Sequence, residues 1–353
     1  MQTVYIIIGF ILICIRSYFT HLLPNTIILT FLINLFLLAS IDYRRISNSL
    51  FVILPFIFYI PFNFQALGFV DILLYSYLLR NYKIKHLAGI SLITAIISLI
   101  LTTYLVGLGA IENETEVARK GLTISNGGYN NPNTLGQIGY SIILTIYFIC
   151  KRRNNLILLF TYSIISYIFF YYSGSRTYLL GTFVLILLGL FLKMKLPLKK
   201  CRFLFSILPI IFCLCILYIL HDISLSDYLD IFASGRFGLY RFNIERMRII
   251  NWIVGLPPVE DLPMDGSFLN LLFSGGIFAL CIFCFLFYKK IQNWDAITKE
   301  YFPALISIII CGLAENTFSS PTSISILFWL ILIKDKTHHR INQLKSHNTV
   351  CLN

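Results

Sequence analysis

Charged residues are scarce in this sequence. Only 12% of the 353 residues are Asp, Glu, Lys or Arg, whereas 58% are hydrophobic. Soluble globular domains carry roughly 25% charged residues, so this chain has too few charged side chains to cover a surface that faces water. The shortage excludes an ordinary soluble enzyme and predicts that a lipid bilayer surrounds most of the chain.

Acidic residues are the rarer kind of charge, with 16 Asp and Glu against 28 Lys and Arg. The net charge of +12 raises the question of a nucleic-acid partner. A nucleic-acid-binding protein gathers its basic residues on one soluble face, whereas here they are scattered over short segments between apolar runs. We therefore expect no nucleic-acid partner and interpret the positive charge as a signal of membrane orientation.

A disulfide framework is not expected either. The nine cysteines lie in apolar runs or in segments predicted to be cytoplasmic, where thiols stay reduced. Cys281 and Cys284 form a CxxC motif inside an apolar run, and no further ligand is near them in the sequence. We interpret them as small apolar residues and expect neither a metal ion nor another cofactor.

Twelve apolar runs predict about twelve transmembrane helices, because roughly 20 helical residues cross the hydrocarbon core. No basic residues precede the first run and no small-residue cleavage site follows it, so we expect it to be retained. The runs are approximately 3–15, 26–41, 49–62, 66–80, 87–108, 134–150, 155–173, 176–192, 203–220, 267–288, 302–315 and 321–333. The predicted fold is an all-α polytopic membrane protein in which residues 1–353 form a single transmembrane domain.

The basic residues predict the orientation of these helices. Of the 28, 20 lie after even-numbered runs, including the tail at 334–353, and eight lie after odd-numbered runs. Four acidic residues fall in the first group of segments and eleven in the second. Because Lys and Arg of short loops stay in the cytoplasm, we expect both termini there. The two long segments, 109–133 and 221–266, then form external loops on the periplasmic side, where we expect any chemistry.

The first external loop is rich in Asn and Gly. Asn131 and Asn133, with Gln137 just beyond them, supply amide groups that suit the hydroxyls of a sugar. The alternative is a structured loop in which Asn131 or Asn133 caps the following helix. Both interpretations are open at this point.

The second external loop contains an arginine cluster. Read as one helix, residues 233–255 place Arg241 and Arg248 on one face and an apolar stripe on another, which is typical of a helix in the membrane interface. Lysine is absent from the loop, and the rigid fork of arginine suits phosphate. Arg236, Arg241 and Arg248 are therefore candidates for phosphate binding, and the alternative is that they only snorkel to lipid head groups.

Three further charges lie near the predicted outer boundary. Arg176 stands where two apolar runs meet, and an unpaired arginine at membrane depth is costly, so it should face a polar cavity or a partner. Asp265 precedes the run at 267–288 and Glu315 ends the run at 302–315. Each has an ordinary alternative, since Asp265 can cap a helix and Glu315 can pair with an arginine, but their gathering at one face predicts a site.

Four stretches carry a resemblance to a known family. They are NPNTLGQIGY at 131–140, SGSRT at 173–177, SGRFGLYR at 234–241 and DGSFLNLLFSGGIFAL at 265–280. In this order, and with the large external loop between the last two, the chain from about 105 to 335 resembles the Wzy-type polymerases of O-antigen and capsule repeat units. These polymerases share a superfamily with the O-antigen ligases.

The resemblance implies an inverting glycosyl transfer at the outer face of the bacterial cytoplasmic (inner) membrane. The donor would be a growing glycan on undecaprenyl pyrophosphate, and the acceptor a single repeat unit on the same lipid. No nucleotide sugar or metal is implied, and a chain-length regulator and a flippase would be membrane partners. The basic residues of the family correspond here to Arg176, Arg236 and Arg241.

Elementary chemistry agrees with this expectation. Arginines can stabilise a pyrophosphate leaving group without a metal, and a carboxylate can accept the proton of the attacking hydroxyl. Asp265 and Glu315 are the candidates for that base, followed by His221.

Two rival functions differ from this expectation. The ligases of the superfamily carry His-Asn where this chain has Asp265 and Gly266. A flippase would show two similar halves and a site at the midplane, whereas the polar residues here concentrate in the two external loops.

Overall fold

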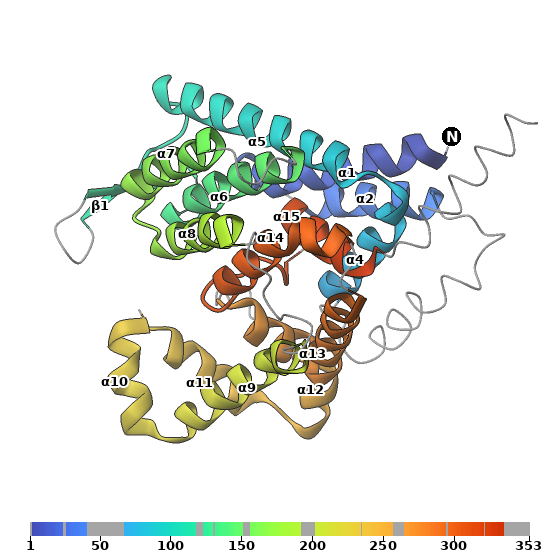
Figure 1. Cartoon of the computed structure of the whole chain (residues 1–353). Coiled ribbons are helices and arrows are strands. Elements are labelled where there is room, and N and C mark those ends of the chain that lie inside the picture. Colours follow the sequence, from blue (N-terminus) through green and yellow to red (C-terminus); the bar gives the residue numbers. More distant parts are fainter. Residues whose placement is uncertain are drawn as a thin grey trace, which may run out of the picture.

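The computed structural model describes residues 2–23, 26–40, 67–117, 123–129, 131–150, 156–191, 202–233, 235–256, 265–293, 296–320 and 322–334. The architecture is all-α, as the sequence predicts (Figure 1). A small hairpin accompanies the helices: β1 (Thr115–Val117) pairs antiparallel with β2 (Thr123–Ser125). This hairpin lies inside the segment predicted as the first external loop.

Helices occupy eleven of the twelve predicted apolar runs, and the run at 49–62 lies outside the described residues. They are α1 (Gln2–Tyr18), α2 (Thr26–Ala39), α4 (Leu67–Leu78), α5 (Ile84–Gly107), α6 (Pro132–Ile149), α7 (Leu156–Ser173), α8 (Arg176–Phe191), α9 (Arg202–His221), α13 (Ser267–Asn293), α14 (Ala296–Gly312) and α15 (Ser323–Ile333). A short 3-10 helix follows two of them: η1 (Thr20–Leu22) comes after α1, and η4 (Leu79–Asn81) comes after α4.

Three of these helices, α5, α7 and α13, are long and apolar enough to cross a membrane. The number is up to four if α9 and α10 (Ile223–Ala233), which meet at an angle of 108°, form one broken span. Several others are apolar but shorter, among them α1, α8, α14 and α15. The described residues thus include helices that could span a membrane, and the full set of twelve spans stays a prediction.

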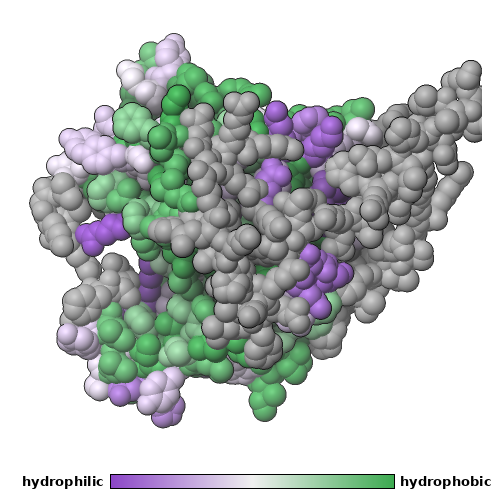
Figure 2. Space-filling view, viewed as in Figure 1, coloured by the Kyte–Doolittle hydropathy of each residue, from purple (hydrophilic) through white to green (hydrophobic). Residues whose placement is uncertain are grey.

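On the face that Figure 2 shows, apolar residues, in green, form patches on the described surface. On α5, Ile100 is 64% exposed, and on α7 Leu156 and Phe160 are 76% and 67% exposed. Apolar patches of this kind are rare on soluble monomers. The surface therefore suits a lipid environment.

The core is built around α15. Its residues from Ser323 to Leu332 are all buried, and it packs against α4, α5, α13 and α14, which places it in the middle of the helices in Figure 1. Phe283 of α13 stacks on Phe318 and Phe328, with ring centroids 5.5 and 6.1 Å apart, and Trp329 meets it edge-on. A helix that is apolar all round is stable only when it is surrounded.

The second predicted loop, 221–266, is largely helical where it is described. It contains α10, α11 (Arg236–Arg246) and α12 (Ile249–Val254), and α10 and α11 extend away from the other helices in Figure 1. The prediction of one continuous helix over 233–255 is wrong. The chain turns extended at Met247 and Arg248 because the Asn251 side chain accepts a hydrogen bond from the Arg248 N–H at 2.9 Å. Arg248 therefore does not continue the face of α11 that carries Arg241.

The short helix α12 rests on a kink in α13. Gly276, within α13, has a φ of +71°, a conformation that is open to glycine and unfavourable for other residues. The kink leaves the Phe273 carbonyl oxygen to accept a hydrogen bond from the Leu256 N–H at 2.6 Å. A Cβ atom at Gly276 would lie only 2.0 Å from the carbonyl oxygen of Ile253. The two backbones therefore meet without intervening side chains.

Replacing Gly276 with alanine should destabilise the protein by about 2 kcal/mol or more, from the sum of backbone strain and overpacking. The measurement is the half-life of the purified protein in detergent at a fixed elevated temperature. Gly89→Ala is the matched control, since a Cβ there meets nothing within 4 Å and alanine favours a helix over glycine. Equal half-lives for the two variants would contradict the close packing of α12 on α13.

Candidate functional site

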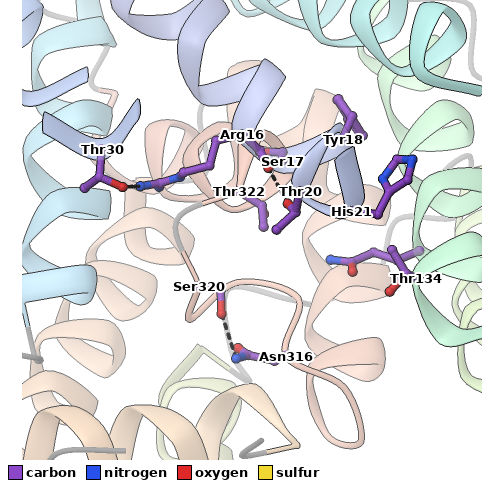
Figure 3. Close-up of a pocket in the computed structure, with 11 residues that line it drawn as sticks. Arg16, Ser17, Tyr18, Thr20, His21, Thr30, Thr134, Asn316, Ser320 and Thr322 are labelled. Atoms are coloured by element: carbon purple, nitrogen blue, oxygen red, sulfur yellow. Dashed lines mark hydrogen bonds between the residues drawn. The ribbon is translucent and has the colours of Figure 1, made fainter. Parts of the chain in front are cut away.

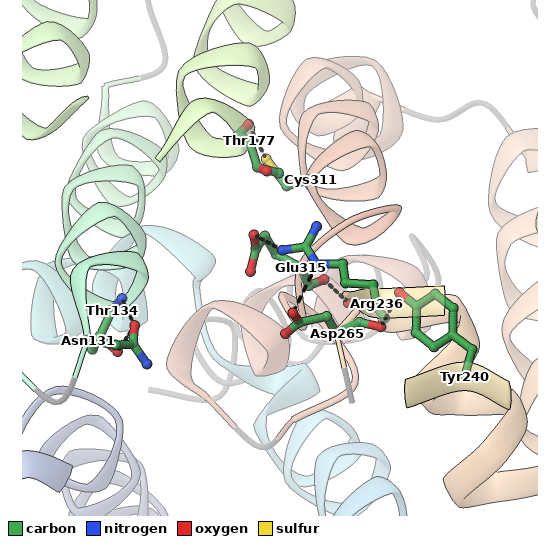
Figure 4. A network of polar contacts seen from close by, with 9 residues as sticks. Asn131, Thr134, Thr177, Arg236, Tyr240, Asp265, Cys311 and Glu315 are labelled. Atoms are coloured by element: carbon green, nitrogen blue, oxygen red, sulfur yellow. Dashed lines mark hydrogen bonds and ion pairs between the residues drawn. The ribbon is translucent and has the colours of Figure 1, made fainter. Parts of the chain in front are cut away.

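Three of the predicted site residues meet in one ion-pair cluster. The Nε of Arg236 lies 3.0 Å from the Oδ2 of Asp265, and its Nη2 lies 2.9 Å from the Oε1 of Glu315 (Figure 4). The residues are 29 and 79 positions from Arg236 in the sequence. Glu315 therefore pairs with an arginine, which was its ordinary alternative, and the partner is an arginine of the second long segment.

The turn between α10 and α11 positions Arg236, which is the first residue of α11. Gly235 before it has a φ of +85°, where glycine is favoured. The Asp230 carboxylate accepts hydrogen bonds from the N–H groups of Phe237 and Gly238 at 2.7 and 3.3 Å. A carboxylate at the first turn of a helix satisfies donors that lack partners within the helix. The turn therefore fixes the start of α11, and with it the backbone position of Arg236.

Asp265 is held from the other side of the cluster. The hydroxyl of Tyr240, one turn along α11 from Arg236, donates to the Asp265 carbonyl oxygen at 3.0 Å. Tyr240 is buried, and burial raises its pKa to about 12, so the phenol stays protonated and able to donate at neutral pH. The backbone of Asp265 and the side chain of Arg236 are therefore fixed by the same helix.

Ser267 positions the loop that carries Glu315. Its hydroxyl donates to the Glu315 carbonyl oxygen at 3.0 Å and accepts from the N–H groups of Thr317 and Phe318 at 2.8 and 3.1 Å. One fully buried hydroxyl thus satisfies three backbone groups of the loop between α14 and α15. The start of α13, two residues after Asp265, is thereby tied to Glu315.

The three charges differ in their exposure to solvent. The side chains of Arg236, Asp265 and Glu315 are 22%, 32% and 8% exposed. Burial raises the pKa of Glu315, although the charge of Arg236 opposes the shift and Asp265 adds to it. Burial alone would lower the pKa of Arg236, but the charges of Glu315 and Asp265 raise it above its ordinary value. Arg236 is therefore always charged, and Glu315 is the carboxyl that takes up a proton more readily than usual.

Arg236 and Asp265 each keep a free hydrogen-bonding position. The Nε and Nη2 of Arg236 donate to the Oδ2 of Asp265 and the Oε1 of Glu315. Among the described residues, no hydrogen bond engages the Nη1 of Arg236 or the Oδ1 of Asp265. Arginine carries five N–H donors, and an ionised carboxylate accepts on both oxygens. The cluster can therefore bind an anion through Arg236 and accept a proton at Asp265.

The other predicted arginines lie outside this cluster. The Nη2 of Arg241 contacts Ser226 and lies 3.0 Å from Asp227, while its buried Nε has no partner among the described residues. Arg248 is exposed at the start of α12, and Arg176 is exposed as the first residue of α8. Thr177, next to Arg176, hydrogen-bonds to the Glu315 side chain, so the start of α8 does adjoin the cluster.

The predicted asparagines have separate roles. The side chain of Asn131 accepts a hydrogen bond from the Thr134 N–H at 2.9 Å and caps α6, as one of the two interpretations expected. Asn133 is exposed. Asn131 lies apart from Arg236 in Figure 4. Sequence reasoning passed over Tyr240, Ser267 and Thr177, although all three lie in the stretches that carry the family resemblance.

A polar cavity of about 480 Å³ lies at the ends of several helices (Figure 3). The end of α1 with η1, the first turns of α6 and the loop before α15 form its walls. Of its lining residues, the sequence indicated Gln137. No carboxylate is found among the described residues that line it. Within the described ranges, no group of three His, Cys, Asp or Glu side chains could hold a metal ion.

A scan against protein-family models and searches of curated proteins and of solved structures found no match. The assignment of function therefore depends on the residues of this chain.

Proposed function

We propose that this protein is a polysaccharide polymerase that joins lipid-linked repeat units of an O-antigen or capsule at the outer face of the bacterial inner membrane. The observation that carries the proposal is the placement of Arg236 between Asp265 and Glu315. An anion-binding donor and a proton acceptor are the two groups that transfer from a lipid pyrophosphate requires. The family resemblance of the stretches around these residues supplies the substrate class.

The reaction places each residue in a role. A hydroxyl at the non-reducing end of the acceptor unit attacks the anomeric carbon of the donor glycan and forms the new glycosidic bond. The hydroxyl proton passes to Asp265, the more exposed of the two carboxylates. The bond between the anomeric carbon and the pyrophosphate oxygen breaks, and undecaprenyl pyrophosphate leaves with its new charge held by Arg236. Inversion follows from attack opposite the leaving group.

Glu315 orients Arg236 and sets the charge of the site. With both carboxylates ionised, the cluster carries a net charge of minus one, which would repel a pyrophosphate. Arg176, Arg241 and Arg248 are proposed to add positive charge around the second phosphate.

Orientation in the membrane is part of the proposal. Both termini are proposed to lie in the cytoplasm, so reporter fusions after residues 125 and 245 should report the external side, and fusions after 196 and 345 the cytoplasm. The physical reason is the excess of Lys and Arg in the segments assigned to the inside. A cytoplasmic signal at 245 would place Arg236 on the wrong face and contradict the polymerase.

Deletion of the gene tests the activity directly. The deletion strain should retain lipid carrier or envelope lipid that bears one repeat unit, and it should lose every longer glycan. A chain-length regulator and a flippase are the proposed membrane partners, and both would remain in that strain. Repeat units trapped on the cytoplasmic side would instead indicate a flippase, and full-length polymer left unattached to its acceptor would indicate an O-antigen ligase.

A further inference from the structure

The polar cavity of Figure 3 adjoins the ion-pair cluster through a single loop. In the loop between α14 and α15, Glu315 reaches Arg236, whereas the next residue, Asn316, lines the cavity. The Asn316 amide donates to the Ser320 hydroxyl at 2.7 Å, which holds the loop in a closed turn along the cavity wall. Two adjacent residues of one loop therefore serve two different sites.

The lining of the cavity selects one class of ligand. Its walls carry hydroxyl and amide groups, namely those of Ser17, Thr20, Thr134, Gln137, Ser320 and Thr322. The hydroxyls of Ser17, Thr20 and Thr134 already donate within the protein and keep acceptor capacity, while the amide of Gln137 can both donate and accept. Such a set of groups matches the hydroxyls of a carbohydrate. A metal cation would need carboxylates, and none is found among the described residues of the lining. A phosphate would need clustered cations, whereas the described lining contains a single arginine, Arg16, which donates to Thr30 at 3.1 Å.

The volume of the cavity and the rigidity of one of its walls also fit a carbohydrate ligand. A volume of about 480 Å³ lies in the range of roughly 300–1,000 Å³ that is typical of small-molecule sites, and it suits a short oligosaccharide. One wall is rigid: the His21 ring packs 4.3 Å from the Tyr129 ring and hydrogen-bonds to Thr102 at 2.8 Å. Gln137 is different, because no hydrogen bond to it is found among the described residues, so its amide is available to a ligand.

We infer that this cavity binds the glycan part of a lipid-linked substrate through sugar hydroxyls. The inference rests on the proposed function and extends it, since it assigns a carbohydrate subsite to residues of α1, α6 and the Glu315 loop. A sugar held there lies beside the loop that positions Glu315 against Arg236. Binding of the glycan and alignment of the ion-pair cluster thus depend on the same backbone.

The test measures sugar binding without requiring polymerisation. The probe is a set of oligosaccharides from partial acid hydrolysis of the host's own surface polysaccharide, added to the full-length protein in lipid nanodiscs. Saturation-transfer NMR should show binding to the unaltered protein, and Gln137→Leu should weaken it about ten-fold, the loss expected from about two ordinary hydrogen bonds. Gln137→Ala, which removes the amide and leaves more space in the cavity, should weaken it similarly and keeps the test valid if leucine disturbs folding.

Matched controls separate this subsite from the catalytic cluster. Thr103→Val removes an exposed hydroxyl that bonds only within α5 and should leave binding unchanged. Asp265→Asn should also retain binding. No binding by the unaltered protein, or equal binding by the Gln137 variants, would overturn the inference. A third outcome separates the two proposals: sugar binding depends on Gln137, but deletion of the gene leaves the polymer intact. That outcome would overturn the proposed polymerase function and retain the carbohydrate site.

The same probe distinguishes the two possible sources of the glycan. A lipid-free repeat unit has the attacking hydroxyl but no pyrophosphate, so it can accept a glycan and cannot donate one. Its extension by the protein would assign the cavity to the acceptor unit. Inhibition without extension would assign the cavity to the donor chain.

Discussion

Lysine in place of Arg236 should abolish long polymer while leaving the protein in the membrane. The guanidinium of Arg236 binds Asp265 and Glu315 at the same time through Nε and Nη2, and it has a further edge for phosphate. A lysine ammonium is a single point charge without this planar fork. Losing one charge-assisted contact costs about 1.5–3 kcal/mol, which slows transfer about ten- to a hundred-fold. The measurement is glycan length together with the level of membrane protein.

Two further variants distinguish a role in the reaction from a role in folding. Arg236→Ala leaves Glu315 without its partner, so we expect a lower protein level as well as no polymer. Adding Glu315→Gln to it removes the unpaired carboxyl and should restore the level without restoring polymer. Arg246→Lys, at the exposed end of the same helix, is the matched control and should be normal. Full-length polymer in the Arg236→Lys strain would contradict binding of pyrophosphate by this arginine.

Asparagine in place of Asp265 should reduce the rate of polymerisation by about 10²–10⁴-fold, the usual contribution of a positioned general base. The substitution nearly preserves size, and Arg236 keeps its bond to Glu315, so the cluster should stay assembled. The decisive quantity is the turnover of lipid-linked repeat units by purified protein, because it gives the rate of the transfer step directly. Loss of turnover at an unchanged thermal stability is the expected result.

Asp222→Asn is the control for this change. Asp222 is exposed and accepts hydrogen bonds from Ser224 and from the Leu225 N–H at the start of α10, and asparagine caps helices about as well as aspartate. It should therefore behave as the unaltered protein. Normal turnover by the Asp265→Asn protein would assign Asp265 to positioning Arg236 alone and would make Glu315 the candidate for the base.

The sequence predicts this cluster because charged groups beside a membrane must find partners. Asp265 and Glu315 lie in or next to apolar runs, where an unpaired charge is costly, so each is expected to find a cation. Arg236, in the middle of the second long segment, is the cation that both of them contact. Arg241, Arg176 and Asn133 are polar residues of the same predicted face, but they do not join the cluster. Arg241 pairs with Asp227, and Arg176 and Asn133 are exposed. Composition and periodicity indicate which residues need partners and do not indicate which segments meet.

The parts that sequence reasoning missed depend on single local contacts. The break between α11 and α12 follows from one side chain, Asn251, which binds the backbone at Arg248. The seating of α12 on α13 depends on glycine at 276, which a hydropathy pattern cannot separate from any other small residue. Ser267 satisfies three backbone groups of a loop 48 residues away, a relation that becomes visible only in three dimensions.

The central position of α15 has a consequence for the order of assembly during synthesis. This helix follows α4, α5, α13 and α14 in the chain, yet each of them packs against it. A ribosome therefore delivers all the surrounding helices before the one that fills the space between them. Until α15 is inserted, its neighbours must hold their inner faces against lipid or against each other, and the loop that carries Glu315 has only one end fixed. The space at the centre of the fold can therefore be filled only at a late stage of synthesis, after these neighbours have been made.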